Sequence, residues 1–370
     1  MGKIGILTFH RAVNYGAVLQ AYALQQVILR KGAVCEIIDF RCRAIEENYR
    51  LIKPIQGDLL IPAVKQTLRS VITFREKRRQ KKGFERFLKQ KLALSEPVET
   101  NPTVLNSRYD AFITGSDQVF NPGMTGTDMS VYYLSFANKP GYSYAASFGK
   151  ANIDDKLSGM AAEWLKRLRG ISVREDSGVR IVQELTGHTP LVHVDPSMLL
   201  QADEWEKLEK KPAGCEEPYI LVYNMLTDEL LYQTAQSLGK IKKRKICFVN
   251  NKILRLKRQY PDFDYIDDAS PEEFLWLVHH ADYVLTSSFH GTVFSLLFHK
   301  RFLVVLPEGE PRNARLVSLL EMADAEERIF TTDVRLEQID EEPDWPGIDV
   351  RISTCRKESF RYIDEIVKNL

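Results

Sequence analysis

The chain has 370 residues, which is long for a single hydrophobic core and fits two domains. Its 51 lysines and arginines balance 50 aspartates and glutamates, so the formal net charge of +1 gives no global field to attract nucleic acid or an acidic polymer. Any anion-binding site must therefore be local, and nucleic acid is not an expected partner.

Cysteine usage and the N-terminus bear on where the protein works. The five cysteines show neither a paired metal-ligand spacing nor a disulfide-dense pattern, which fits a reducing cytosol. The first apolar run is too short for a signal peptide, and no run approaches the ~18 apolar residues needed to cross a bilayer. We therefore expect a cytoplasmic protein.

Strand and helix signals alternate through the first 200 residues. The strand at 3–9 is followed by a polar loop, a helix at 17–31 and a second strand at 33–40, an order that predicts parallel pairing. Residues 41–95 lack strand signals and are interpreted as a helical insertion. Later strands end in polar turns within the segments DAFITGSDQVFNP, GYSYAASFG, RGISVRE and PLVHVDP. Together these elements predict a first lobe over 1–200.

A turn-rich connector at 201–218 precedes a second alternating series. Its apolar strands predict a second lobe over 215–350 and lie within YILVYNM, KICFVNN, DYVLTSS and RFLVVLP. The last segment, 355–370, is an amphipathic helix with no following strand, so we expect it to pack back on the first lobe. The predicted fold class is α/β, with two Rossmann-like, doubly wound lobes that face each other across a cleft.

The segment DYVLTSSFHGTVFSLLF at 282–298 carries the strongest functional signal. A buried strand and a buried helix are joined by a polar junction that contains Ser287, Ser288, His290 and Gly291. In a parallel sheet this junction is the ligand-binding edge, and unpaired N–H groups at the helix start favour an anion. The alternative is that a serine merely caps the helix and that His290 is an ordinary junction residue.

Polar residues also follow strands of the first lobe, where they could bond the hydroxyl groups of a sugar. The first cluster consists of His10, Asn14, Tyr15, Gly16 and Gln20, and the second of Gly115, Ser116, Asp117, Gln118 and Asn121. Asn14 and Asp117 could instead be helix caps. A third cluster contains Ser147 among small residues, for which close packing is the simpler interpretation.

Three arginines stand where they could bind a carboxylate or a phosphate through paired hydrogen bonds. Arg174 ends a predicted strand, although Glu175 or Asp176 could neutralise it. Arg312 and Arg315 lie about twenty residues after the histidine, in a loop that could fold over the same anion or remain at the surface.

One run of charge, REKRRQKKGFERFLKQK at 75–91, has apolar residues at helical spacing. It is typical of a helix with one solvated face. The alternative is a surface that contacts an anionic membrane or a lipid-linked acceptor, which would place the protein at the inner face of the membrane.

Six segments together resemble the polysaccharide pyruvyl transferase family, in order and over most of the chain. They are TFHRAVNYGAVLQAYAL, ITGSDQVFNP, YAASFG, SVREDSG, VDPSMLL and SSFHGTVFSLL. The resemblance implies a GT-B-like fold and the transfer of pyruvate from phosphoenolpyruvate onto two hydroxyls of one sugar, which forms a ketal in a cell-surface glycan or its precursor. The implied partners are phosphoenolpyruvate, as a co-substrate rather than a cofactor, and a sugar or glycan-precursor acceptor.

The resemblance also implies roles for particular residues. The essential histidine of the family matches His290, its strand-end arginine matches Arg174, and its acidic residue in the first lobe matches Asp117. The basic residue that follows the histidine matches Arg312 or Arg315.

The chemistry of such a transfer suits these residue types. Phosphoenolpyruvate carries a carboxylate and a phosphate, so its site needs fixed positive groups. Protonation of its methylene carbon needs an acid, for which we expect His290, and Asp117 is the expected base for the sugar hydroxyl. No His, Cys or carboxylate residues show metal-ligand spacing, so we expect neither a metal nor another cofactor. One anion contact must come from elsewhere or be lost, because Ser288 stands where many relatives carry arginine, two positions before the histidine.

Two other functions fit the same pattern. A glycosyltransferase with two similar lobes would apply the same strand-end residues to a nucleotide-sugar donor. The second is a non-catalytic glycan-binding relative whose donor site has decayed, for which Ser288 is the hint.

Overall fold

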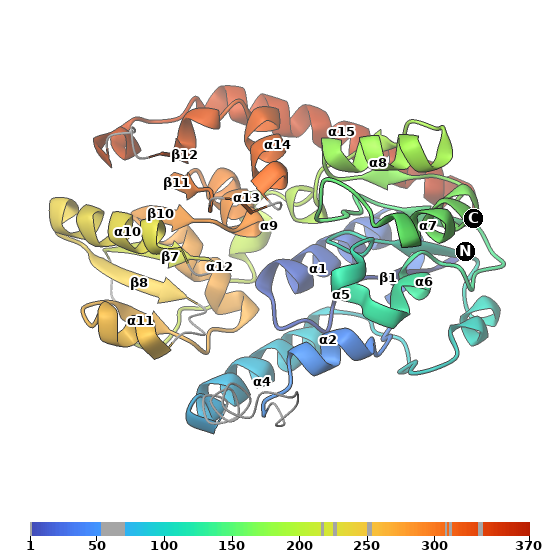
Figure 1. Cartoon of the computed structure of the whole chain (residues 1–370), viewed down its shortest axis with the longest axis horizontal. Helices are drawn as coiled ribbons and strands as arrows, with labels where there is room; N and C mark the ends of the chain where they lie inside the picture. Colours follow the sequence, from blue (N-terminus) through green and yellow to red (C-terminus); the bar gives the residue numbers. More distant parts are fainter. Residues whose placement is uncertain are drawn as a thin grey trace.

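The computed structural model describes residues 2–52, 71–215, 218–224, 228–249, 254–307, 309–310, 313–331 and 336–370. The chain forms two α/β lobes that lie side by side, each built on a parallel sheet (Figure 1). The predicted fold class, with two Rossmann-like lobes that face each other, is confirmed.

The sheet of the first lobe has four parallel strands in the order β2-β1-β3-β4. They are β1 (Lys3–Leu7), β2 (Val34–Ile37), β3 (Ala111–Thr114) and β4 (Gly141–Ser143). A short parallel pair, β5 (Ser172–Val173) and β6 (Leu191–Val192), follows along the same edge through a bridge between Ala146 and Val173. Strand β3 is buried along its whole length, as expected for a central parallel strand covered by helices on both faces.

Helices of the first lobe connect these strands. The long ones are α1 (Tyr15–Arg30), α4 (Phe74–Lys91), α7 (Asp155–Lys166) and α8 (Asp176–Thr186), and the short ones are α2 (Arg43–Asn48), α5 (Pro122–Thr125), α6 (Met129–Tyr132) and α9 (Ala202–Glu206). Helices α2 and α4 fall within the predicted insertion at 41–95, of which 53–70 lie outside the described residues.

The second lobe contains a six-stranded parallel sheet in the order β12-β11-β10-β7-β8-β9. Its strands are β7 (Tyr219–Tyr223), β8 (Lys245–Val249), β9 (Asp264–Ile266), β10 (Tyr283–Thr286), β11 (Arg301–Val305) and β12 (Ile329–Phe330). The connecting helices are α10 (Glu229–Lys242), α11 (Leu254–Gln259), α12 (Pro271–His279), α13 (Phe289–Leu297) and α14 (Asn313–Ala323). Strand β10 lies between β7 and β11, so its carboxyl end opens at the middle of the sheet.

The last helix, α15 (Trp345–Lys368), joins the two lobes. It packs against α14 in the second lobe and reaches the first, where Tyr362 Oη donates to the carbonyl oxygen of Ser143 (3.1 Å) and Ser359 Oγ accepts from the N–H of Val194 (3.3 Å). This helix is longer than the predicted segment 355–370. In the described ranges, neither α15 nor any shorter helix has an apolar stretch that could cross a bilayer.

An apolar interface holds the two lobes together. The ring of Tyr15 from α1 stacks on Phe274 from α12, with centroids 4.4 Å apart. Phe294 of α13 lies edge-on to the same Phe274 ring at 6.0 Å, and all three side chains are fully buried or nearly so. The hydrophobic core is therefore continuous between the lobes.

Candidate active site

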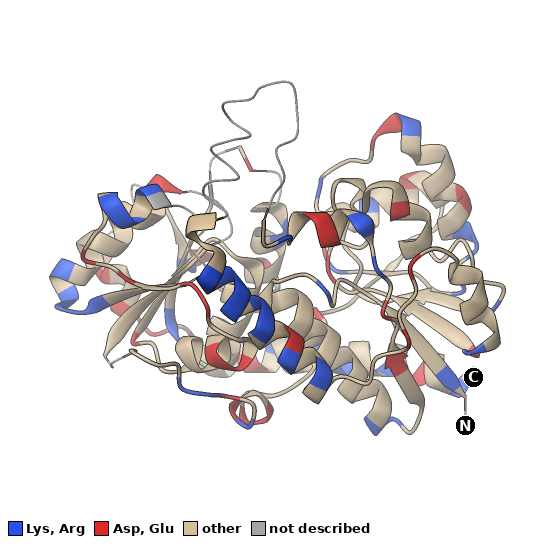
Figure 2. Cartoon of the chain, turned by 90° about the horizontal axis from the view of Figure 1, so that it is seen from below, with Lys and Arg blue, Asp and Glu red and all other residues tan. Residues whose placement is uncertain are grey.

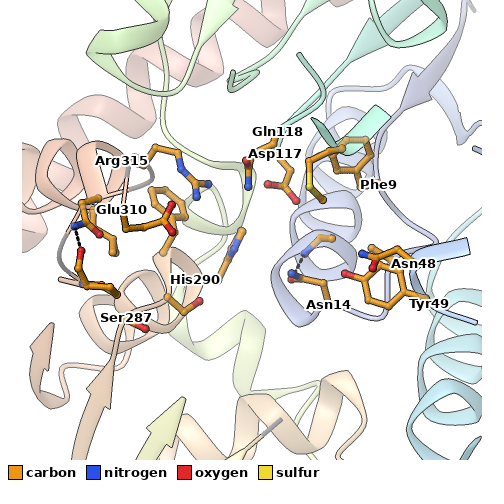
Figure 3. Close-up of a pocket in the computed structure, with 18 residues that line it drawn as sticks. Phe9, Asn14, Asn48, Tyr49, Asp117, Gln118, Ser287, His290, Glu310 and Arg315 are labelled. Carbon is orange, nitrogen blue, oxygen red and sulfur yellow. Dashed lines mark hydrogen bonds between the residues drawn. The ribbon is translucent and has the colours of Figure 1, made fainter. Parts of the chain in front are cut away.

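A cavity of about 270 Å³ lies between the lobes, at the carboxyl ends of their strands. The first lobe contributes Asn14, Asp117 and Gln118 to its wall. The second lobe contributes Ser287, Ser288, His290 and Arg315. Figure 3 shows the imidazole of His290 between Ser287 of its own lobe and the side chains of the first lobe.

His290 lies in the first turn of α13, the helix that follows β10. Ser288 caps this helix, because its Oγ accepts a hydrogen bond from the N–H of Gly291 (3.4 Å). A Cβ atom on Gly291 would come within 2.3 Å of Thr286 Oγ1, so glycine lets the helix begin this close to the strand end. Ser288 is thus a helix cap that also lines the cavity.

Gly16 at the start of α1 lies directly against the ring of His290. A Cβ atom at this position would be 1.9 Å from His290 Nδ1, so any larger residue would displace the imidazole. Asn14 caps α1, since its Oδ1 accepts from the N–H of Ala17 (3.2 Å), and it also faces the cavity. The first helix of one lobe therefore fixes the histidine of the other.

Arg174 is buried behind the cavity among three carboxylates. Its Nη1 donates to Asp195 Oδ2 (2.7 Å), its Nε is 3.5 Å from Glu175 Oε2, and its Nη2 is 3.8 Å from Asp117 Oδ1. The guanidinium carbon also lies 4.2 Å from the centre of the Phe289 ring, a cation–π contact. Of the two acids predicted to neutralise Arg174, Glu175 is the one that approaches it.

Asp195 connects Arg174 to the histidine. Its Oδ2 is 3.5 Å from His290 Nε2, and its Oδ1 accepts from the N–H (3.0 Å) and the Oγ (2.7 Å) of Ser197. Burial alone would raise the pKa of this carboxyl, but His290, Arg174 and Ser197 outweigh it and hold the pKa well below its usual range. Asp195 is therefore a fixed negative charge beside the imidazole.

Several buried polar atoms at this place have no hydrogen-bond partner in the described part of the chain. They are His290 Nε2, Arg174 Nε and Nη2, Glu175 Oε2 and Ser287 Oγ. Buried polar groups normally find a partner, because leaving one without costs about 1–3 kcal/mol. His290 and Ser287 lie on the wall of this cavity, and Arg174 and Glu175 lie on the wall of an adjoining one.

Asp117 and Gln118 face His290 from the first lobe (Figure 3). Asp117 adopts a left-handed backbone conformation with φ of 68°, uncommon for a residue with a side chain. Asn121, one turn later, donates to Gln118 Oε1 (2.9 Å) and caps α5 by accepting from the N–H of Gly123 (3.0 Å). The cap predicted as an alternative role for Asp117 is therefore made by Asn121.

Of the first predicted cluster, only Asn14 lines the cavity, whereas His10, Tyr15, Gly16 and Gln20 do not. Tyr15 lies in the apolar interface, where its Oη donates to the carbonyl oxygen of Ala269 (3.0 Å). Gln20 is fully buried, and its Oε1 accepts from the N–H of Ser116 (3.1 Å). The side chains of Tyr15 and Gln20 hold neighbouring segments in place and do not form part of the cavity wall.

Three residues of the other first-lobe clusters also support the site from behind. Ser116 Oγ lies 3.2 Å from Asp195 Oδ2 and Ser147 Oγ donates to Glu175 Oε1 (2.6 Å), so each contacts a carboxylate beside Arg174. A Cβ atom on Gly115 would lie 2.2 Å from the carbonyl oxygen that follows β4, which explains the glycine.

Arg315 of α14 lines the cavity opposite Asp117 and Gln118. It also lines an adjoining cavity of about 350 Å³, on whose wall Arg174 and Asp195 lie. The predicted Arg312 lies outside the described residues.

Four further residues at this site were not predicted from the sequence. Asn48 and Tyr49 come from α2 and the residue after it, and Glu310 from the loop before α14; all three line the cavity. Burial, together with the nearby charge of Asp117, raises the pKa of Tyr49 to about 12. No local pattern singles out these three residues. The fourth, Asp195, had a signal, since it is an acid in the polar turn that follows a predicted strand.

A group with metal-ligating side chains forms elsewhere, from two adjacent histidines and a glutamate distant from them in the sequence. Glu209, His279 and His280 each place one possible ligand atom within 4.8 Å of the other two. Burial raises the pKa of Glu209 to about 7, against the opposing effect of His280. None of the three lines the cavity between the lobes.

A family model described as "Polysaccharide pyruvyl transferase" matches residues 14–308, far more than half of the chain. The chain belongs to this family. The polysaccharide pyruvyl transferase match includes Asp117, Arg174, Asp195 and His290, and it ends before Arg315. The protein is accordingly a member of a transferase family that modifies polysaccharides.

Solved structures share the two-lobed outline of this polysaccharide pyruvyl transferase family member at very low identity. MnaA from S. aureus with UDP has 9% identity and a TM-score of 0.49, covering 97% of this chain and 91% of its own. UDP-GlcNAc 2-epimerase from Neisseria meningitidis bound to UDP-GlcNAc has 10% identity and a TM-score of 0.48, covering 97% and 99%. UGT89C1 from Arabidopsis thaliana complexed with quercetin has 11% identity and a TM-score of 0.47, covering 100% and 99%. A likeness this weak says nothing about activity, and no curated protein sequence matches the chain.

Proposed function

We propose that this protein transfers the pyruvyl group of phosphoenolpyruvate onto two hydroxyls of one sugar, in a polysaccharide or its precursor, and forms a ketal. The observation that carries the proposal is the set of buried polar atoms around His290 and Arg174 whose hydrogen bonds are incomplete, beside the two adjoining cavities. Such a set suits a small ligand that carries both charge and hydrogen-bonding groups.

The donor needs positive groups for its carboxylate and phosphate. Arg315 reaches into the cavity from α14, and the start of α13 presents the positive end of a helix dipole. Arg174 retains two N–H groups without hydrogen-bond partners. Because three carboxylates surround Arg174, we assign the doubly charged phosphate to Arg315 and the helix start, and the carboxylate of the donor to Arg174.

His290 is the acid in this scheme. Its imidazole gives a proton to the methylene carbon of phosphoenolpyruvate, which makes the adjacent carbon electrophilic. The negative charge of Asp195, 3.5 Å from Nε2, stabilises the protonated imidazole before that transfer. Asp195 and Arg174 thus position and charge the histidine, and Asp195 does not itself exchange a proton.

Asp117 is the base and faces the histidine from the other lobe. It accepts the proton of the first sugar hydroxyl as that oxygen bonds to the electrophilic carbon. Phosphate then leaves, and the second hydroxyl closes the ketal ring. Of the two hydroxyl protons, one replaces the proton lost by His290 and the other departs with phosphate, so the protein returns to its starting state.

Phosphate release from phosphoenolpyruvate tests the donor and the reaction together. Purified protein is incubated with phosphoenolpyruvate and a panel of sugar acceptors, and both free phosphate and the mass of the acceptor are followed. The proposal expects phosphate to appear only with a suitable acceptor, whose mass increases by one pyruvyl ketal.

The two other functions give different outcomes in the same experiment. A glycosyltransferase would consume a nucleotide sugar and leave phosphoenolpyruvate intact. A non-catalytic relative would bind the glycan without consuming either donor. Either outcome across an acceptor panel that includes free, nucleotide-linked and lipid-linked sugars would overturn the proposal.

A further inference from the structure

Helix α4 concentrates positive charge far beyond the rest of the molecule. Its 18 residues carry nine lysines and arginines and two glutamates, a net charge of +7, whereas the whole chain has +1. The remainder of the chain is therefore net negative. A basic segment on an otherwise acidic molecule produces a local field rather than a general one.

The exposed cations of α4 form one continuous row, which we call the cationic ridge. Apart from the adjacent Arg78 and Arg79, successive members are three or four residues apart, the spacing that places side chains on one face of a helix. They are Arg75, Arg78, Arg79, Lys82, Arg86 and Lys89. At 1.5 Å per residue the ridge is about 21 Å long.

The opposite face of α4 is fixed against the protein. Phe84, Phe87 and Leu88 are buried in the core shared by the two lobes, and α4 packs against α1 and α12. The ridge consequently faces away from this core, and Figure 2 shows the ribbon of α4 with several blue segments on the face seen from below. Of its members, Arg79 pairs with an acid of the second lobe, Asp268 (3.3 Å).

Two large apolar side chains are exposed just before the ridge. Val71 is 55% and Ile72 57% exposed, and both precede the first turn of α4. Apolar side chains beside a row of cations are typical of helices that lie in the interface of a membrane. The phosphate groups of a nucleic acid would make no favourable contact with these apolar side chains.

We propose that the cationic ridge docks this protein on an anionic phospholipid surface, with Val71 and Ile72 entering the headgroup region. Gln80 of α4 donates a hydrogen bond to Tyr15 Oη (3.1 Å) in α1. Gly16, which follows Tyr15, lies against the ring of His290. The ridge therefore lies on the helix that supports the cavity. Binding to the membrane does not depend on the proposed chemistry. The idea that it brings the protein to a lipid-linked acceptor rests on the proposed function.

Sedimentation with lipid vesicles tests the docking surface on the full chain. We expect binding to vesicles of phosphatidylcholine mixed with phosphatidylglycerol, none to phosphatidylcholine alone, and weaker binding as salt is raised. The triple variant Arg78→Glu, Lys82→Glu, Arg86→Glu should lose at least about 100-fold in affinity, because each cation near an anionic surface contributes about fivefold. Phosphate release with a soluble acceptor should stay unchanged in that variant.

A matched control distinguishes the effect of the cationic ridge from the effect of the total charge of the protein. Lys139→Glu, Lys150→Glu and Lys166→Glu remove the same charge from exposed positions of the first lobe and should keep the affinity within about threefold. Val71→Ser with Ile72→Ser should weaken vesicle binding about tenfold at unchanged charge. Equal losses in the ridge and control variants, equal binding to both kinds of vesicle, or tighter binding to duplex DNA than to anionic vesicles would overturn the proposal.

Discussion

The contact between the lobes has an apolar half and a polar half, and the same elements build both. In the apolar half, Tyr15 of α1 stacks on Phe274 of α12, and Phe294 of α13 closes the contact. In the polar half, the next residue of α1, Gly16, meets His290 at the start of α13. Burial stabilises the first half, whereas the second keeps charged groups whose hydrogen bonds are incomplete.

The difference shows how a site whose buried polar groups have incomplete hydrogen bonds can be kept in place. Leaving buried polar groups without partners is unfavourable, so the adjacent apolar contacts must hold the lobes together against it. We therefore expect substitutions in the apolar half to change mainly the free energy of unfolding. In the polar half, we expect displacement of His290 to change catalysis and removal of a buried charge to change stability as well. Four variants test this division, in order of decreasing expected effect.

Removal of the central ring of the apolar half should give the largest effect. Phe274 is fully buried between three aromatic neighbours, so Phe274→Ala should lower the free energy of unfolding by about 4 kcal/mol. Denaturant unfolding measures the loss, and turnover of the protein that remains folded should change only a few-fold. A loss below about 1 kcal/mol would show that the interface is not the support we describe.

Asp195→Asn should act on both stability and its pH dependence. Removing the carboxylate leaves Arg174 with two more distant acids, and we expect a loss of about 3 kcal/mol at neutral pH. The folded pKa of Asp195 lies below its unfolded value, so its contribution is present above pH ~4 and is lost as the pH falls further. Unfolding of the variant should thus depend less on pH below about 4 than that of the wild type. The exposed control Asp155→Asn should change stability by less than about 0.5 kcal/mol.

Gly16→Ala should mainly affect catalysis. The added methyl group would overlap the imidazole of His290, which must move, and we expect kcat/KM to fall about 100-fold. Gly159→Ala in α7 is the matched control, because nothing lies within 4 Å of its added Cβ and the change should be neutral or slightly stabilising. Similar activities for the two variants would contradict the contact between Gly16 and the histidine.

Tyr15→Phe should have the smallest effect. It removes the hydrogen bond to the carbonyl oxygen of Ala269 and the one accepted from Gln80, at a cost of about 1 kcal/mol in stability. The KM values for donor and acceptor should not change, because Tyr15 does not line the cavity. A raised KM would instead support the sequence-based prediction that this tyrosine binds substrate.

The alternation of strands and helices made the fold predictable, because it leaves few arrangements other than parallel sheets. The same rule places polar residues that follow strands at one edge, and Asp117, His290 and Ser287 do meet there. The direction of each helical side chain was not predictable, since neighbours differ by about 100° around the axis. Tyr15 and Gln20 therefore turn inward while Asn14 faces the cavity.

Site residues that come from distant segments of the chain could not be predicted from the sequence either. Tyr49 reaches the cavity from the helical insertion, and neither its spacing nor its neighbours signal this. Asp195 differs, because its place in the polar turn after a predicted strand matches that of Asp117. Asp195 is therefore predictable from the same rule that identifies Asp117.

Proton transfer to carbon in deuterated water tests the central claim most directly. Wild-type protein that turns over phosphoenolpyruvate and a sugar acceptor in D₂O should place one deuterium in the methyl group of each ketal formed, visible by mass spectrometry. His290→Asn should remain folded and lose about 1,000-fold or more in both phosphate release and deuterium incorporation. Phosphate release at the wild-type rate by the His290→Asn variant would contradict the role of this imidazole as the acid.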